Sequence, residues 1–88
     1  MDYVVFGRAN ETDADENFIG FHFEQFDVVA DSAEDALEQA EAQMCSRLDS
    51  VNLLEHKEFL GFELTGLSQS DYLALKPEIE SGEFDLFN

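Results

Sequence analysis

An excess of carboxylates constrains this chain more than any other feature of its sequence. Its 88 residues include 21 Asp and Glu against four Lys and Arg, for a formal net charge of −17. The resulting self-repulsion works against a compact state. The chain therefore needs an apolar core strong enough to fold in spite of its own charge.

The composition supplies such a core. Hydrophobic residues make up 44% of the chain and nine residues are Phe, far more than a disordered segment carries. A chain this short has room for one domain, which we place over residues 1–88, and it buries only roughly 60 to 65% of its unfolded surface. A deep enclosed active site is therefore hard to build.

The charge density is comparable with that of nucleic acid. Duplex DNA carries one charge per about 1.7 Å of axis, so a net charge of this size corresponds to about 29 Å of duplex. A compact domain of this length has a diameter of about 30 Å. Direct binding to nucleic acid or to an anionic membrane is disfavoured. The expected partners are basic: a nucleic-acid-binding protein, a polycation or cations themselves.

Membrane segments, a leader, disulfides and cofactor motifs are the next features to consider in the sequence. The chain has no run of 18 apolar residues and no basic, apolar leader at its start, so we expect a cytoplasmic protein. Its one cysteine, Cys45, excludes an internal disulfide framework, and we interpret it as a buried structural thiol. No motif indicates a cofactor.

The first half of the chain predicts two antiparallel strands. Tyr3–Ala9 is apolar on both parities, as in a central strand, and the polar segment 10–17 connects it to a second strand over Phe18–Ala30. In that second strand Phe21 and Phe23 share one parity, whereas the apolar residues from Phe26 onward have the other. Either a β-bulge near residues 24–25 or burial on both faces explains the change.

The second half predicts a main helix, a third strand and a short second helix. The main helix begins with Asp31 or Ser32 as its cap and ends either near residues 49–50 or close to Lys57. Its apolar stripe consists of Ala33, Ala36, Leu37, Ala40, Met44 and Leu48.

The third strand covers Glu58–Gly66, with Leu60, Phe62 and Leu64 on one face and Phe59, Gly61 and Glu63 on the other. A short helix capped within residues 68–71 should end or kink at Pro77. The tail, 78–88, adds an edge strand or packs its Phe rings against the body. These elements predict an α+β fold, with a small, mainly antiparallel sheet of about three to four strands packed by one main helix plus a short second helix.

Three acidic segments are candidate partner-binding surfaces: one face of the main helix, the connection between the first two strands and the carboxyl-terminal segment. Steps of three and four residues along a helix advance about 4.5 to 6 Å, which is comparable with phosphate spacing. A solvated helix face is the alternative. The candidate residues are Asp31, Glu34, Asp35, Glu38 and Glu41; Glu11, Asp13, Asp15 and Glu16; and Glu78, Glu80 and Glu83.

In size, charge and predicted α+β character, and in acidic surfaces such as the one from Asp31 to Glu41, the chain resembles the small acidic DNA-mimic proteins that phages use against restriction enzymes and CRISPR complexes. That class has neither a diagnostic motif nor a common fold. The resemblance implies an inhibitor, not an enzyme, whose carboxylates take the places of phosphates in a basic DNA-binding channel.

Other interpretations compete with the inhibitor. A domain adapted to a high-salt cytoplasm also has an acidic surface. Residues 13–24 partly match the frame of a calcium-binding EF-hand loop, although Phe18 stands at the position of the invariant Gly. His22 and Glu24 have the spacing of a catalytic base and its orienting partner, or of a surface pair on a strand.

The Phe residues exceed what one Ala-rich helix covers. Some aromatic surface remains for a partner or for a second copy of the chain, unless the short helix and the tail cover it.

Overall fold

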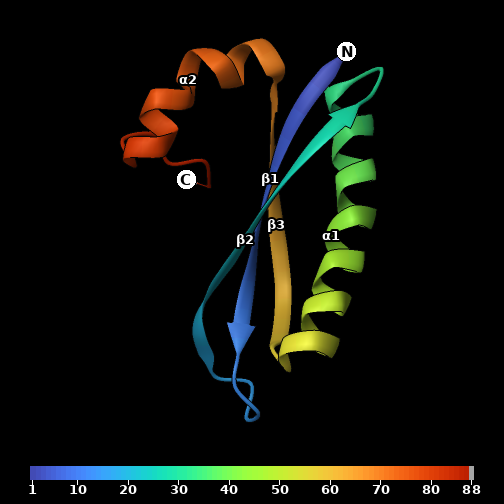
Figure 1. The fold of residues 1–88 in the computed structure, drawn as a ribbon, viewed down its shortest axis with the longest axis vertical. Coiled ribbons are helices and arrows are strands. Elements are labelled where there is room, and N and C mark those ends of the chain that lie inside the picture. The colour runs from blue at the N-terminus through green and yellow to red at the C-terminus, as the bar shows by residue number, and fades with distance from the viewer. Residues whose placement is uncertain (88) are drawn as a thin grey trace.

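Apolar residues of both parities place β1 (Asp2–Thr12) at the centre of the sheet. The computed structural model describes residues 1–87, and Asn88 of the predicted tail lies outside them. An antiparallel sheet with strand order β2-β1-β3 forms the middle of the molecule (Figure 1). The other elements are β2 (Phe18–Val29), α1 (Ala33–Glu55), β3 (Glu58–Ser68) and α2 (Gln69–Ser81).

The predicted α+β architecture is confirmed. Helix α1 runs along one face of the sheet, whereas α2 and the carboxyl-terminal segment lie on the other side (Figure 1). The molecule is elongated, with extents of 41 × 28 × 20 Å. No helix within residues 1–87 is both long and apolar enough to cross a membrane.

Strand β2 pairs with β1 without interruption from Gly20 to Val29, so the first of the two explanations for its change of parity, a bulge near residues 24–25, is wrong. The irregularity lies instead next to the hairpin, between Glu11 and Thr12. The two parities of β2 point to opposite faces: Phe26 is buried in the core that α1 covers, and Phe23 is exposed on the open face. Both faces of this strand are thus apolar, but α1 covers only one.

A bulge occurs in β3, where the sequence predicts regular alternation. The β1–β3 register shifts between Ala9 and Glu11, and Gly61 adopts φ 77°, a conformation that favours glycine. As a result Phe59 packs against the same core as Phe62, and the prediction that these two residues lie on opposite faces is wrong.

Helix α1 begins at the second of its two predicted caps. Ser32 Oγ accepts a hydrogen bond from the Asp35 backbone N–H at 3.1 Å. The helix continues through the weak break at residues 49–50 to Glu55, and His56 closes it in a left-handed conformation. Its buried stripe is Ala36, Ala40, Met44, Leu48 and Val51. Ala33, expected in this stripe, is exposed.

Helix α2 begins at Ser68, whose Oγ accepts from the Asp71 N–H at 3.2 Å. It continues past Pro77 to Ser81, so of the two predicted effects of Pro77 the end of the helix is wrong; Gly82 ends it, in a left-handed conformation. Residues 82–87 form no strand. They pack against the open face, and Thr65 Oγ1 donates a hydrogen bond to the Leu86 carbonyl at 2.9 Å.

Candidate functional site

The acidic row of α1 borders a groove between this helix and β3. Glu34, Glu38 and Glu41 are exposed and line the groove together with the apolar side chains of Phe62 and Leu64. These three glutamates fall within about 60° of one another around the helix axis. They form a narrow carboxylate row beside a partly buried apolar floor.

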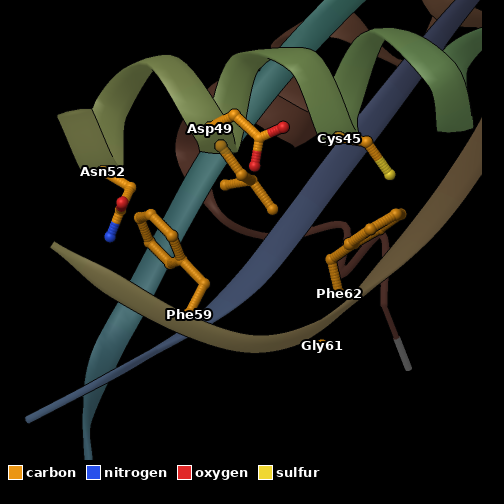
Figure 2. Close-up of a pocket in the computed structure, with 7 residues that line it drawn as sticks. Cys45, Asp49, Asn52, Phe59, Gly61 and Phe62 are labelled. Atoms are coloured by element: carbon orange, nitrogen blue, oxygen red, sulfur yellow. The ribbon is translucent and has the colours of Figure 1, made fainter.

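The same groove continues toward the carboxyl end of α1. There Cys45, Asp49 and Asn52 lie above Phe59 and Phe62 of β3 (Figure 2). Asp49 extends the acidic row. It was not among the predicted residues, although it lies eight positions beyond Glu41 on the same helix. Cys45 is exposed in this groove, so its interpretation as a buried thiol is wrong.

The remaining two predicted residues of this helix lie outside the groove. Asp35 is about 100° further round the helix than Glu34, and its backbone N–H serves the Ser32 cap. Asp31 precedes the helix and is exposed. Of the five predicted residues, only Glu34, Glu38 and Glu41 therefore form a row along the groove.

Every Lys and Arg of the chain forms an ion pair away from this row. Arg8 pairs with Glu63, Arg47 with Glu24, Lys57 with Glu11 and Glu55, and Lys76 with Glu80. Across residues 1–87, no ion pair involves an acidic residue of α1 other than Glu55, at its last position. The carboxylates of the groove therefore keep their negative charge uncompensated.

The acidic connection between β1 and β2 is organised internally. Asp13 Oδ1 accepts hydrogen bonds from the backbone N–H groups of Asp15 and Asn17, both at 2.9 Å. The bond from Asn17 is the main cause that lowers the pKa of Asp13 below its usual value. Glu16 is exposed with φ 65°, and Glu11 contacts Lys57 at 3.7 Å.

An EF-hand is contradicted by the elements on either side of this connection. Strands flank it where that motif has helices. Glu24, at the end of the frame, instead holds Arg47 and His22. Within residues 1–87 no three His, Cys, Asp or Glu side chains are grouped so that they could hold a metal ion.

The three acidic segments point in different directions. The connection forms the tip of the hairpin at one end of the long axis, whereas α2, which carries Glu78 and Glu80, lies near the other end and across the sheet from α1 (Figure 1). Glu83 follows α2, and Glu80 contacts Lys76 at 4.0 Å. These predicted residues do not form one continuous surface, and the row on α1 stands apart from the other two segments.

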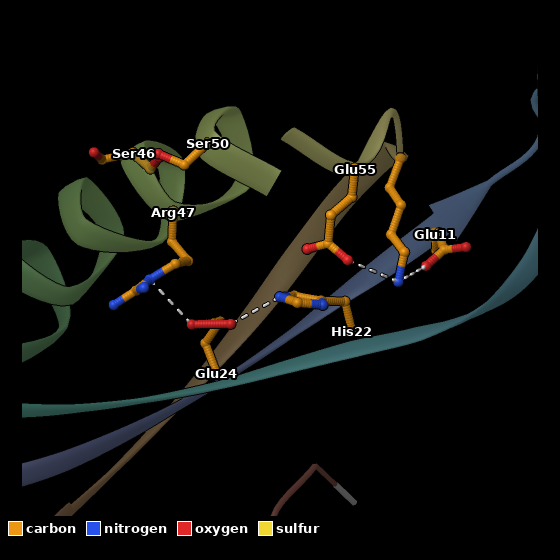
Figure 3. A network of polar contacts seen from close by, with 8 residues as sticks. Glu11, His22, Glu24, Ser46, Arg47, Ser50 and Glu55 are labelled. Atoms are coloured by element: carbon orange, nitrogen blue, oxygen red, sulfur yellow. Dashed lines mark hydrogen bonds and ion pairs between the residues drawn. The ribbon is translucent and has the colours of Figure 1, made fainter. Parts of the chain in front are cut away.

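His22 and Glu24 share a strand face, as the catalytic hypothesis requires. His22 Nε2 lies 2.8 Å from Glu24 Oε2, and Arg47 Nε lies 3.2 Å from Glu24 Oε1 (Figure 3). The pair occupies the face that α1 covers, with about a fifth of each side chain exposed, so it is not a surface pair. Because Arg47 belongs to α1, this network ties the helix to β2.

The comparisons with known proteins give no relative. No protein-family model matches the chain, and neither a curated protein nor a solved structure matches it. The function has to be inferred from the geometry and charge of the chain itself.

Proposed function

We propose that this protein is an acidic inhibitor that occupies a basic nucleic-acid-binding surface of another protein, as a mimic of DNA. The target class is a host defence nuclease or a CRISPR complex. The observation that carries the proposal is the uncompensated row of Glu34, Glu38 and Glu41 on α1. All four Lys and Arg side chains are engaged elsewhere, so none of them masks this row.

The physical basis is competition for the same cationic site. A basic channel attracts any rigid array of negative charges, and a helix holds its carboxylates at fixed spacing without further ordering. Once bound, the body of the protein blocks nucleic acid from the channel. Such binding should weaken strongly as salt is added, because the attraction between exposed charges is screened.

The three acidic segments point in different directions, which limits the part of the surface that can mimic DNA. A single flat surface cannot contact the hairpin tip, α1 and α2 together, because they lie on different sides of the molecule. The part that acts as a mimic is therefore the groove side of α1, extended by Asp49. The other acidic residues contribute to the long-range field that steers the approach.

A charge-matched pair of variants tests this assignment. Glu34→Gln/Glu38→Gln/Glu41→Gln removes the row, and Glu78→Gln/Glu80→Gln/Glu83→Gln removes the same number of charges on the other side of the sheet. Both would be assayed against purified restriction nucleases and CRISPR complexes, for binding at about 0.05 and about 0.5 M KCl and for inhibition of DNA cleavage. The row variant should lose inhibition and the control should keep it; equal loss in both would mean that total charge acts and the row does not.

The spread of the carboxylates in several directions supports a second candidate, a domain adapted to high salt. Such a surface stays hydrated in concentrated KCl and self-repels in dilute buffer. Thermal unfolding at about 0.15 M and about 3 M KCl distinguishes the two. A halophilic domain should melt at a much lower temperature in dilute salt, whereas full stability there contradicts this candidate.

A further inference from the structure

The open face of the sheet carries a contiguous row of aromatic rings along β2. The ring centroids of Phe18 and Phe21 are 4.9 Å apart, those of Phe21 and Phe23 are 6.1 Å apart, and Phe23 is followed by Phe87 at 6.5 Å. Phe18 is 57%, Phe21 46% and Phe23 62% exposed. We call Phe18, Phe21 and Phe23 the aromatic row. Contiguous exposed rings of this kind mark interaction surfaces, since soluble monomers rarely leave them open.

Arg8 shows which chemical group these rings accept. It is paired with Phe23 across the β1–β2 ladder. Its guanidinium carbon lies 4.4 Å from the ring centroid of Phe21 and 4.9 Å from that of Phe87. A planar guanidinium stacks on aromatic faces while its N–H donors remain free for carboxylates, and Arg8 also contacts Glu63 at 2.8 Å. An arginine on the strand next to β2 thus covers the rings from the inner side.

The outer side of β2 offers an equivalent position. Met1 and Ala30 exchange hydrogen bonds in both directions, from Met1 N to Ala30 O at 3.1 Å and from Ala30 N to Met1 O at 3.0 Å. Because bonded and non-bonded pairs alternate in an antiparallel ladder, the backbone groups of Phe21, Phe23 and Gln25 point away from β1. Within residues 1–87, β2 has no strand on that side.

The opposite end of this edge is closed. Gln39 of α1 donates from Nε2 to the Val29 carbonyl at 3.2 Å, as expected if the backbone of Val29 also points outward. Neither Pro nor Lys, two residues that commonly guard edge strands, occurs in β2. The edge is therefore covered near Val29 and accessible beside the aromatic row.

We propose that an extended, arginine-bearing segment of a partner protein adds as a strand to the free edge of β2. Its backbone pairs with the outward groups of Phe21, Phe23 and Gln25, which is the mode of β-strand addition. Its alternate side chains lie on the open face, where arginines stack on the aromatic row from the outer side as Arg8 does from the inner side.

Charge selects this occupant over a second copy of the chain. Asp15 and Glu16 precede the row, and Asp27 follows it on the same face of β2; all three are exposed. A second copy would bring its own net charge of −17 to this surface. It also lacks a spare cation here, because Arg8 is already paired with Glu63.

The aromatic row and the free edge of β2 are distinct from the acidic row on α1. The aromatic row lies on the face of the sheet opposite α1, at the β2 edge, whereas the acidic groove borders β3. The inference goes beyond the proposed function and does not depend on it. Removing one surface should leave the other intact.

The probe is a short fluorescent peptide of alternating Arg and Thr, compared with the same peptide of alternating Lys and Thr. Fluorescence anisotropy measures the affinity of each for the full chain. The Arg peptide should bind at least about fivefold more tightly, because lysine has the charge but not the stacking plane. Equal affinities would overturn the proposal, since they would mean that only charge is recognised.

Gln25→Pro tests the strand addition. It removes an outward N–H, breaks no bond to β1 and leaves every ring in place, so peptide binding should fall at least about tenfold. Phe21→Thr/Phe23→Thr should lower it similarly, whereas Leu54→Gln, which removes an exposed apolar side chain of α1, should not change it. Unchanged binding by Gln25→Pro would overturn the proposal.

Two controls separate loss of peptide binding from misfolding and from a general effect of charge. If Gln25→Pro does not fold by circular dichroism, an Arg peptide N-methylated on the side that pairs with β2 replaces it, and it should lose the binding. Glu34→Gln/Glu38→Gln/Glu41→Gln should bind the peptide within about twofold of the parent, since these charges lie across the sheet. Sedimentation that shows a dimer abolished by Phe21→Thr/Phe23→Thr would assign this edge to a second copy and overturn the proposal.

Discussion

The two faces of the sheet are made from the same three strands and differ in almost every other respect. The face under α1 holds side chains that are largely buried, such as Val5, Ala9 and Phe26, and Met44 of α1 packs completely buried against them. The opposite face buries Val4 but holds the half-exposed rings of Phe18, Phe21 and Phe23, and α2, which lies on that side, has no buried residue. The comparison indicates that stability is concentrated on one face, which leaves the other free for recognition.

Met44→Ala should lower the stability more than any other variant that tests this difference between the faces. Met44 is fully buried, so its truncation should lower the free energy of unfolding by about 2 to 5 kcal/mol. Phe23→Ala removes a larger side chain from the open face but should cost under about 1 kcal/mol, because that ring is mostly solvated. Urea denaturation measures both. Similar losses for the two variants would show that the open face is part of the stabilising core.

Gly7→Ala should have the next largest effect, because α1 approaches the sheet closely at this position. A Cβ at Gly7 would lie 2.7 Å from Met44 Sδ and 3.0 Å from its Cε. Overpacking of this kind costs about 1 to 3 kcal/mol. In a Met44→Ala background the clash with Met44 is removed and only the contact with Leu64 Cδ2 at 3.3 Å remains. A double-mutant cycle should therefore give a coupling of at least about 1 kcal/mol. Additive losses would mean that the clash with Met44 is not the cause.

Removing the cap of each helix tests the difference between the two faces with a smaller change in stability. Ser32 and Ser68 make the same hydrogen bond at the start of α1 and of α2. Ser32→Ala should lower global stability by about 1 kcal/mol, since α1 unfolds with the core. Ser68→Ala should lower it less and should instead speed amide hydrogen exchange within α2, because a helix without buried residues opens locally. Equal global losses would contradict the difference between the faces.

The smallest expected effect is at the hairpin tip, beyond both faces. Asp13 has a pKa below its usual 3.8 because its carboxylate accepts backbone hydrogen bonds, first of all from Asn17. Its contribution to stability is therefore present above pH 3.8 and is lost as the pH falls through the lower folded-state pKa. Asp13→Asn should flatten this part of the stability profile, as measured by urea denaturation against pH. A profile unchanged by Asp13→Asn would contradict this contribution of the carboxylate.

Local signals in the sequence were enough for the elements that depend on near neighbours. Spacing within one helix limited the cap to Asp31 or Ser32, and the structure selects Ser32. Of the predicted stripe, Ala36, Ala40, Met44 and Leu48 are buried. The central position of β1 in the sheet also follows from its two-sided apolar pattern. The cap and the stripe depend on residues within one segment, and the position of β1 depends on how apolar that segment is on both sides.

Features that depend on distant pairing were not predictable. The bulge at Gly61 is set by the register between Ala9 and Phe62, which are far apart in the chain. The directions of the three acidic segments depend on how α1 and α2 are placed on opposite sides of the sheet. The same is true of the candidate site, since residue spacing identified Glu34, Glu38 and Glu41 but could not show that they border the groove beside β3.

The exposure of Cys45 has a consequence for anyone who handles the protein. It is the chain's one cysteine, so oxidation to a disulfide can only join it to another molecule. Two chains joined there are linked through the groove between α1 and β3, next to the acidic row of each. Any covalent dimer that forms without reductant should therefore have this groove obstructed at Cys45.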